Sequence, residues 1–205
     1  MRVEPELEDW KVAKEVYRLF SRKPGSAHIA SELTLAHLAA LVRTRSINSV
    51  IEFGAGIGTL TYLLLSRLGG DRRVISVERN SYCLDQLMHN IPPELREGWS
   101  IKHPRNVDGS IEIDLLIADG MHAQERTSDC LQIGSFCFVD GERAKTRATI
   151  ERGLANRGLT CQFVYHSHRS PRVEWRRTAS GFPYPRVNVS LSPTRGCWIG
   201  EVGTA

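Results

Sequence analysis

The chain has 205 residues, of which 41% are hydrophobic and 24% are charged, and its net charge at pH 7 is +4. This length suits one domain that buries roughly 70% of its unfolded surface, which excludes a wholly disordered chain. No stretch approaches the roughly 18 apolar residues that a membrane-spanning helix needs. Residues 1–10 contain four acids and no apolar core, unlike a secretory signal. We therefore expect a cytoplasmic protein that binds no membrane.

The cysteines predict neither a disulfide framework nor a zinc site. There are five, scattered without any C-x-x-C spacing: Cys83, Cys130, Cys137, Cys161 and Cys197. An odd number of cysteines at such spacings is not typical of disulfide-rich or zinc-binding domains. We expect them to be reduced and, for the most part, to lie in the core.

The first 45 residues are predicted to form two amphipathic helices. Apolar residues recur every three or four positions in residues 6–20 and again in residues 31–45. Pro24 and Gly25 separate the two stretches, and Ser31 suits the start of the second helix. These helices are expected either to cover the substrate side of the domain or to form the contact of a homodimer.

From residue 46 onward, predicted strands alternate with predicted helices. Residues 49–53 (SVIEF) have the composition of a strand, residues 54–58 form a glycine-rich turn, and residues 59–68 a helix. The pattern continues with strands at 73–77, 100–103, 111–118, 135–139, 161–166 and 197–202, and helices at 81–89, 123–131 and 145–157. Such alternation predicts a single doubly wound α/β domain with a parallel sheet covered by helices on both faces.

Residues 167–195 are predicted to form a long irregular connection before the last strand, because they contain four prolines and one glycine. Six arginines and the aromatic residues Trp175, Phe182 and Tyr184 lie here, opposed only by Glu174. This composition fits an RNA-binding arm, a lid over an acidic small substrate, or a solvated hairpin extension. The modest net charge favours a small-molecule partner over a nucleic acid.

Four predicted strands end on or beside an acidic residue: Glu52, Glu78, Asp119 and Asp140. In an open α/β sheet, ligands bind beyond the carboxyl ends of the strands, near the point where the strand order reverses. These four acids are therefore expected to lie near one ligand site.

The glycine-rich turn and Glu78 predict a ligand that contains adenosine. Gly54, Gly56 and Gly58 let the chain turn sharply and approach a ligand closely. Glu78 follows Gly58 by 20 residues, where an acid can accept hydrogen bonds from a ribose diol. The spacing differs from the G-x-G-x-x-G of dinucleotide sites, and Glu52 would repel phosphates while suiting a cationic amino acid. An NAD-dependent oxidoreductase of the Rossmann type is kept as an alternative.

Residues 52–58 (EFGAGIG) resemble the E/D-x-G-x-G-x-G signature of class I S-adenosylmethionine-dependent methyltransferases, with Glu78 as the ribose-binding acid. The resemblance covers residues 31–205. It implies one Rossmann-like domain with a seven-stranded, mostly parallel sheet whose last strand is antiparallel, built from N-terminal helices in 1–45 and a donor-binding core in 46–205. The implied donor-binding residues are Glu52, Gly54, Ala55, Gly56, Gly58, Glu78 and Asp119.

Residues 117–122 (IADGMH), Asp129 and residues 138–141 (FVDG) resemble small-molecule O-methyltransferases related to macrolide-sugar and cephalosporin-pathway enzymes and, more distantly, to catechol O-methyltransferase. In such relatives the matching acids often hold Mg²⁺, which implies a magnesium site on Asp119 and Asp140. Gly141 departs from the Asn or Asp of metal-dependent members, although Glu142 offers a further oxygen ligand.

The resemblance implies methyl transfer from S-adenosylmethionine to a hydroxyl of a small molecule. We expect Asp119, His122 and Asp140 to act in catalysis, with His122 as the base, since a neutral imidazole accepts a proton near pH 7. Two alternatives in other classes are an RNA methyltransferase that uses residues 167–195 and a non-catalytic module that binds the donor.

Overall fold

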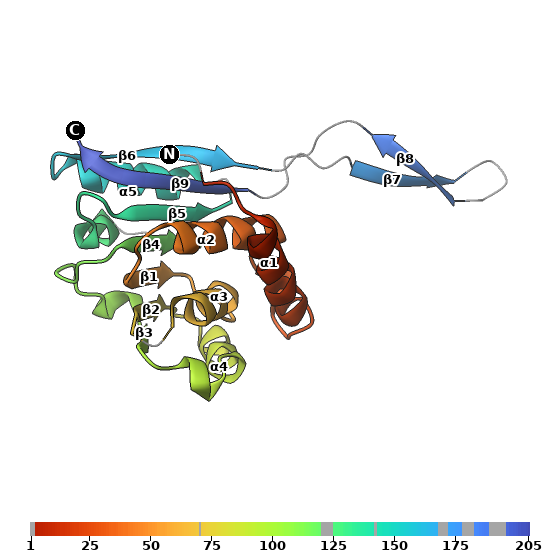
Figure 1. Ribbon diagram of the computed structural model, residues 1–205, viewed down its shortest axis with the longest axis horizontal. Coiled ribbons are helices and arrows are strands. Elements are labelled where there is room, and N and C mark those ends of the chain that lie inside the picture. The colour runs from red at the N-terminus through yellow and green to blue at the C-terminus, as the bar shows by residue number, and fades with distance from the viewer. Residues whose placement is uncertain are drawn as a thin grey trace.

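The computed structural model describes residues 3–69, 71–119, 125–141, 143–167, 172–177, 183–188 and 196–205. Its elements form a layered α/β arrangement with a central sheet (Figure 1). The α-helices are α1 (Leu7–Phe20), α2 (Glu32–Thr44), α3 (Thr59–Leu68), α4 (Ser81–Asn90) and α5 (Ala144–Ala155). The strands are β1 (Ser49–Phe53), β2 (Arg73–Val77), β3 (Trp99–Lys102), β4 (Leu115–Ala118), β5 (Phe136–Asp140), β6 (Leu159–His166), β7 (Arg172–Arg177), β8 (Pro183–Asn188) and β9 (Cys197–Thr204).

The main sheet has seven strands in the order β3-β2-β1-β4-β5-β9-β6. Strands β1 to β5 pair in parallel, whereas β9 is antiparallel to both β5 and β6. The order reverses between β1 and β4, so a crevice is expected beyond the carboxyl ends of these strands. The predicted seven-stranded sheet with an antiparallel last strand is confirmed.

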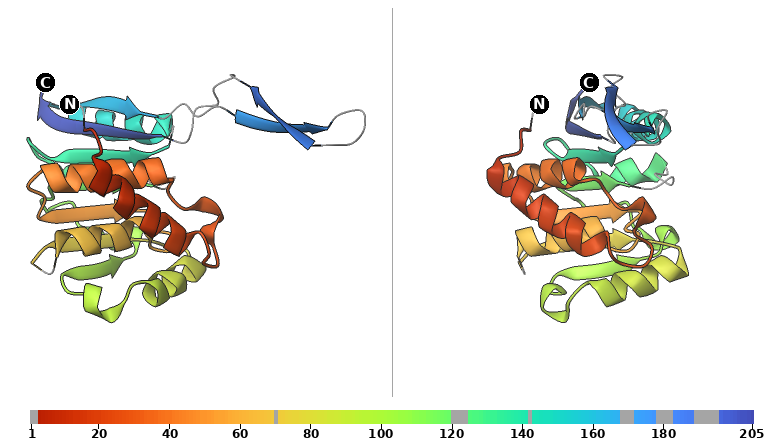
Figure 2. Two further views of the ribbon diagram at one scale, coloured as in Figure 1. Left: turned by 45° about the vertical axis from the view of Figure 1, so that its right-hand side comes forward. Right: turned by 90° about the vertical axis from the view of Figure 1, so that its right-hand side faces the viewer.

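Each face of the sheet has its own hydrophobic core, because side chains of a strand alternate between faces. Val50 and Ile117 pack with α2 and α3 in one core, and their neighbours Ile51 and Leu116 pack with α5 in the other. Helices α1, α2 and α3 contact one another, and Figure 2 shows them on the same face of the sheet. The predicted coverage of both faces is therefore confirmed.

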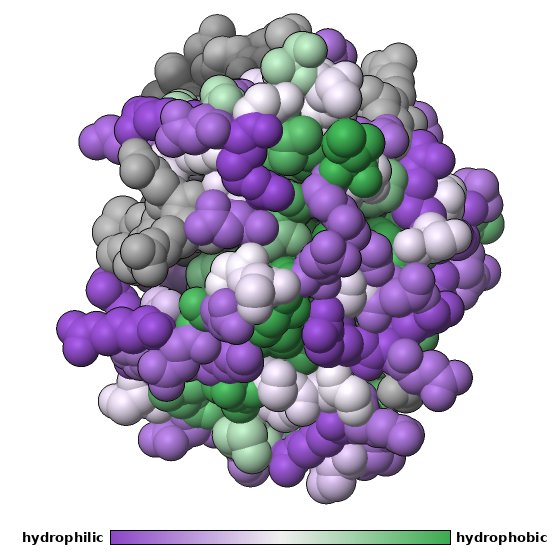
Figure 3. All heavy atoms as spheres, turned by 90° about the vertical axis from the view of Figure 1, so that its left-hand side faces the viewer, coloured by the Kyte–Doolittle hydropathy of each residue, from purple (hydrophilic) through white to green (hydrophobic). Residues whose placement is uncertain are grey.

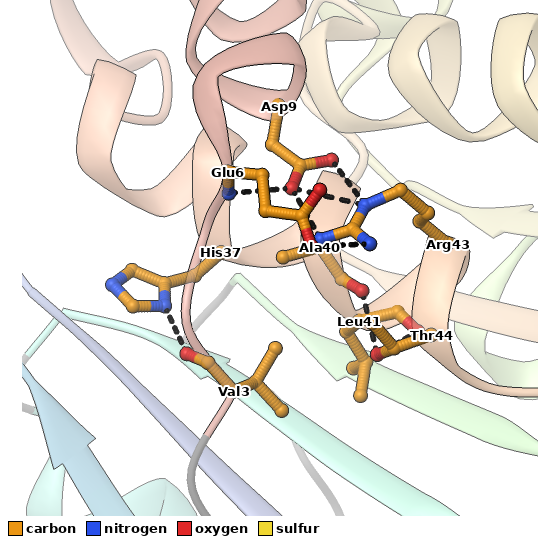
Figure 4. A network of polar contacts seen from close by, with 8 residues as sticks. All are labelled: Val3, Glu6, Asp9, His37, Ala40, Leu41, Arg43 and Thr44. Atoms are coloured by element: carbon orange, nitrogen blue, oxygen red, sulfur yellow. Dashed lines mark hydrogen bonds and ion pairs between the residues drawn. The ribbon is translucent and has the colours of Figure 1, made fainter.

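Helix α2 is buried over ten consecutive residues, Leu33 to Val42, because α1 covers the side that faces away from the sheet. A polar network joins the two helices (Figure 4). The fully buried carboxylate of Asp9 accepts hydrogen bonds from Nε and Nη2 of Arg43 and from the backbone N–H of Glu6. Nδ1 of His37 lies 3.0 Å from the carbonyl oxygen of Val3. The N-terminal segment is thereby fixed to α2.

Three expectations differ from the structure. The predicted strand at 111–118 is confined to Leu115–Ala118, because the N–H of Ile113 donates to the carbonyl of Cys130 instead of joining the sheet. In the predicted helix at 123–131, residues Glu125–Cys130 form a 3-10 helix. Within the predicted irregular connection, β7 and β8 pair as an antiparallel two-stranded sheet, which lies apart from the main sheet in Figure 1.

Among the described residues, no helix is long and apolar enough to cross a membrane. Figure 3 shows the face at the amino ends of the parallel strands. Its hydrophobic side chains appear in separate areas between hydrophilic ones. The carboxyl ends of the strands, on the opposite side, border the cavity described next.

Candidate active site

A cavity of about 340 Å³ lies beyond the carboxyl ends of β1, β2 and β4. Phe53, Val77 and Asp119 mark the ends of these strands in its wall, and residues 54–57 form the floor between them. The connection between α1 and α2 supplies Gly25, His28, Ile29 and Ala30 to the cavity wall. This volume and this position at the switch point are typical of small-molecule sites.

The glycine-rich turn is held against the end of β2. The N–H groups of Gly54 and Ala55 both donate to the carbonyl of Val77, at 2.9 and 3.3 Å, and Gly58 N–H donates to the carbonyl of Ala55 at 2.9 Å. Gly54 and Gly56 have φ angles of 87° and 55°, which favour glycine. The turn therefore presents its backbone to the cavity without a β-carbon at these two positions.

Gly58 acts in packing. It is the N-cap of α3 with a φ of 97°. A β-carbon added there would lie 2.7 Å from Cδ1 of Leu87 on α4. Gly58 does not line the cavity.

The carboxylate of Glu78 lines the cavity and is bound by three backbone N–H groups. Gly56 N–H donates to Oε2 at 2.9 Å, and the N–H groups of Arg79 and Asn80 donate to Oε1 at 2.7 and 2.8 Å. These bonds fix an acceptor group between the glycine-rich turn and the end of β2. A ribose diol placed there would find the carboxylate already oriented.

Glu52 lies behind the cavity wall, 1% exposed, and is not among the residues that line it. Its carboxylate accepts hydrogen bonds from the hydroxyls of Thr61 and Ser76. Burial raises the pKa of Glu52 to about 7, although these hydroxyls oppose the shift. Glu52 therefore contacts α3 and β2, and it does not face the cavity.

Asp119, Arg143 and Asp140 form a charged cluster at the ends of β4 and β5. Nη2 of Arg143 lies 2.9 Å from Oδ1 of Asp119, and Nε of Arg143 donates to the carbonyl of Asp140 at 2.9 Å. The hydroxyl of Thr34 donates to Oδ1 of the fully buried Asp140 at 2.7 Å. Helix α2 thus reaches the cluster from the other side of the sheet.

The pKa of Asp119 is raised well above its usual value, first by burial and next by the negative charge of Asp140. The guanidinium of Arg143 acts in the opposite direction. The site therefore holds two carboxyl groups close to one cation, and one of these carboxyl groups faces the cavity.

The described residues do not fit the magnesium site that the resemblance implies. The guanidinium of Arg143 is bound to Asp119, where a metal ion would need the carboxylate. Asp140 is fully buried against Thr34 and does not line the cavity. Within the described part of the chain, no three His, Cys, Asp or Glu side chains are grouped to hold a metal ion, while Glu142 lies outside it.

Of the predicted donor-binding residues, the structure places five in the cavity wall and leaves two behind it. The five are Gly54, Ala55, Gly56, Glu78 and Asp119, and the two are Glu52 and Gly58. The predicted base His122 lies outside the described residues, and Asp129 is exposed. Sequence reasoning missed the contributions of Gly25, His28, Ile29, Ala30, Arg79, Cys83, Pro104 and Arg143.

Thr59, another missed residue, begins α3 in the cavity wall and is 4% exposed. Its hydroxyl has no hydrogen-bond partner among the described residues. A buried hydroxyl in this state is suited to a polar group of a bound ligand. The position directly after Gly58 was the signal in the sequence, since the first residues of a helix that follows a glycine-rich turn face the ligand.

No protein-family model matches the sequence, and no curated protein does either. Solved structures do match. A precorrin-6y C5,15-methyltransferase from Geobacter metallireducens is 13% identical with a TM-score of 0.62, over 87% of this chain and 91% of that one. The O-methyltransferase TomG from Streptomyces achromogenes, solved with S-adenosylmethionine, is 15% identical with a TM-score of 0.54, over 98% and 92%.

A tRNA methyltransferase from Aquifex aeolicus also matches, with 14% identity and a TM-score of 0.58, over 94% of this chain and 76% of that one. These proteins methylate different classes of acceptor according to their names, whereas the sheet order and the antiparallel last strand are the features that this chain shares with the class I fold. The chain therefore has the fold of the S-adenosylmethionine-dependent methyltransferases.

Proposed function

We propose that the protein is an S-adenosylmethionine-dependent methyltransferase that methylates a hydroxyl of a small molecule. The observation that carries this proposal is the hydrogen bond between Gly56 N–H and the Glu78 carboxylate in the wall of the cavity at the switch point. It joins the two sequence features expected to bind the donor at the place where this fold binds ligands.

The residues around the cavity suit the two ends of the donor. The Glu78 carboxylate is placed to accept hydrogen bonds from ribose hydroxyls, as the spacing to the glycine-rich turn predicts. Asp119, at the end of β4, offers a carboxyl group to the methionine end of the donor. The turn at residues 54–56 lies between them, and its glycines allow close contact with the donor.

Bound S-adenosylmethionine supplies a methyl group on a positively charged sulfur. The acceptor oxygen forms a bond to this methyl carbon while the carbon–sulfur bond breaks and its electrons return to sulfur. The hydroxyl proton must leave, and His122 is the base that we propose to take it. The chain's main contribution is to hold donor and acceptor in line, which is worth several kcal/mol of the barrier.

Asp119 and Asp140 are proposed to act in different ways. Asp119 lines the cavity and can contact ligands. Asp140 is fully buried, so its proposed role is to hold Arg143, through its backbone carbonyl, and Thr34, through its carboxylate. The O-methyltransferase among the matched structures supports a hydroxyl acceptor.

The experiment is a methyl-transfer assay with methyl-labelled S-adenosylmethionine. Acceptors are a panel of small hydroxyl compounds and, separately, total tRNA, with S-adenosylhomocysteine release measured in parallel. We expect label transfer to at least one hydroxyl compound and its loss in Asp119→Asn. Transfer to tRNA alone, weakening steeply with salt, would replace the proposal by an RNA methyltransferase. Donor binding without S-adenosylhomocysteine release from any acceptor would favour the non-catalytic module.

A further inference from the structure

Arg143 is a cation fixed in the wall of the cavity. It follows β5 as the N-cap of α5, and two hydrogen bonds hold its guanidinium: Nε donates to the carbonyl of Asp140, and Nη2 donates to the carboxylate of Asp119, both at 2.9 Å. The side chain is 24% exposed. A planar group held at two of its nitrogens is oriented before a ligand arrives, so little side-chain entropy is lost on binding.

The guanidinium has donors to spare. An arginine carries five N–H donors, and the two bonds to Asp119 and Asp140 use two of them. Among the described residues, no further acceptor bonds to Arg143. Two remaining N–H groups on a guanidinium can bind both oxygens of a carboxylate, which is the anion that this geometry fits well.

The charge around the cavity favours an anionic partner for a cationic donor. The ionisable side chains of its described wall, apart from His28 and Cys83, are two arginines and two carboxyl groups: Arg79, Arg143, Glu78 and Asp119. Their formal charges cancel. A donor that carries a sulfonium adds positive charge to this balanced wall, and an acceptor with a carboxylate restores the balance.

The two arginines lie on different sides of the cavity. Arg79 directly follows Glu78 beyond β2, where the ribose is proposed to bind, whereas Arg143 belongs to the β4–β5 side. With the donor extending from Glu78 toward Asp119, Arg143 lies at the methionine end of the cavity, 2.9 Å from the Asp119 carboxylate. The donor's own carboxylate is therefore the competing partner of Arg143, and the charge balance described above favours the acceptor.

We propose that Arg143 binds a carboxylate of the methyl acceptor, so that the acceptor belongs to the hydroxy-carboxylic acids. This inference rests on the proposed function. Arg143 then contributes specificity by direct contact with the substrate, and the ion pair with Asp119 orients it for that contact.

The test compares benzoate with benzyl alcohol, which have the same ring but differ in charge. Each is titrated by calorimetry into protein saturated with S-adenosylhomocysteine. We expect benzoate to bind at least about tenfold more tightly than benzyl alcohol, as a charge-assisted pair predicts. Arg143→Met should remove this preference and Arg143→Lys should retain part of it, because lysine keeps the charge without the fork. Arg79→Met, the same substitution on the other side of the cavity, should leave the preference intact.

Two outcomes contradict the inference directly: equal affinity of the wild-type protein for the two compounds, including no binding of either, or a benzoate preference that survives in Arg143→Met. A further control measures the affinities of the wild-type protein and of Arg143→Met for S-adenosylhomocysteine and for methylthioadenosine, which lacks the amino-acid end. If Arg143→Met weakens only the former, Arg143 binds the donor's own carboxylate and the acceptor assignment is wrong. If the wild-type protein binds neither nucleoside, the proposed function itself fails, which separates that failure from the failure of this inference.

Discussion

Gly56 N–H donates a 2.9 Å hydrogen bond to the carboxylate of Glu78, so that the glycine-rich turn and the acid after β2 form one unit. The two residues are 22 positions apart, and the parallel pairing of β1 with β2 brings them together. The bond leaves the Glu78 carboxylate facing the cavity from a fixed position. Preorganisation of this kind reduces the cost of binding a ligand there.

Removing the charge of Glu78 is expected to weaken donor binding. Glu78→Gln keeps the size of the side chain but gives weaker hydrogen bonds to a ribose, since a bond to a charged group contributes about 1.5–3 kcal/mol. We predict a 10- to 100-fold higher Kd for S-adenosylhomocysteine in calorimetry. Glu94→Gln, at an exposed site in a 3-10 helix, is the control. Equal affinity of the two variants would show that Glu78 does not bind the ribose.

Gly58→Ala is expected to destabilise the fold through both its backbone and its packing. The φ of 97° strains any residue with a β-carbon, and that carbon would lie 2.7 Å from Leu87. Gly69→Ala is a matched control, because its φ is 76° and nothing lies within 4 Å of the added carbon. In urea unfolding we predict that Gly58→Ala loses about 1–3 kcal/mol more unfolding free energy than Gly69→Ala, which is the usual cost of overpacking. Equal losses would exclude the packing role.

The buried carboxyl group of Glu52 should make stability depend on pH. Its pKa is about 7 in the fold against a usual 4.5, so the protonated form is favoured in the folded state. The stabilisation is complete below about pH 4.5 and is lost as pH rises through about 7. Glu52→Gln should remove this dependence. Because one pKa unit corresponds to about 1.4 kcal/mol, the wild-type protein should lose about 3 kcal/mol of unfolding free energy between pH 4.5 and pH 8 that the variant does not lose. Parallel stability curves for the two proteins between pH 4 and 8 would contradict this prediction.

Arg43→Met is expected to lower the unfolding free energy clearly. The substitution leaves the fully buried carboxylate of Asp9 without its cation, and removing one partner of a buried pair is strongly destabilising. The control is Lys11→Met, which removes an exposed ion pair with Glu8 and should change stability by less than about 1 kcal/mol. Thermal and urea unfolding measure both. A similar small change in Arg43→Met would mean that water replaces the guanidinium.

The sequence predicts the parallel core of this fold well, because periodicity and turn residues act locally. β1, α3 and β2 have the bounds expected from their strand-like composition and helical pattern. Residues 111–114 were expected to continue this strand pattern, yet the N–H of Ile113 donates to the carbonyl of Cys130 instead of to a neighbouring strand. A long-range partner of this kind has no signal in the sequence around the residue that it bonds.

The sequence predicted residues of the candidate site where a recognisable motif lies at the end of a strand. Glu78 and Asp119 follow β2 and β4, and the topology places both at the cavity. The position of Glu52 before the glycines does not indicate where its side chain points. In the structure the side chain lies against Thr61 of α3 and does not line the cavity. For residues 1–45 the sequence offered the substrate side only as one of two alternatives, and it did not indicate which residues reach the site. These are Thr34, which bonds Asp140, and the cavity-lining Gly25, His28, Ile29 and Ala30.

The central claim is that the cavity at the switch point binds S-adenosylmethionine. The most direct measurement is isothermal titration of the purified protein with S-adenosylhomocysteine, and separately with NAD. We predict saturable binding of S-adenosylhomocysteine at one site per chain, weakened in Glu78→Gln, and no comparable binding of NAD. Tighter binding of NAD, or no heat with S-adenosylhomocysteine, would contradict the account.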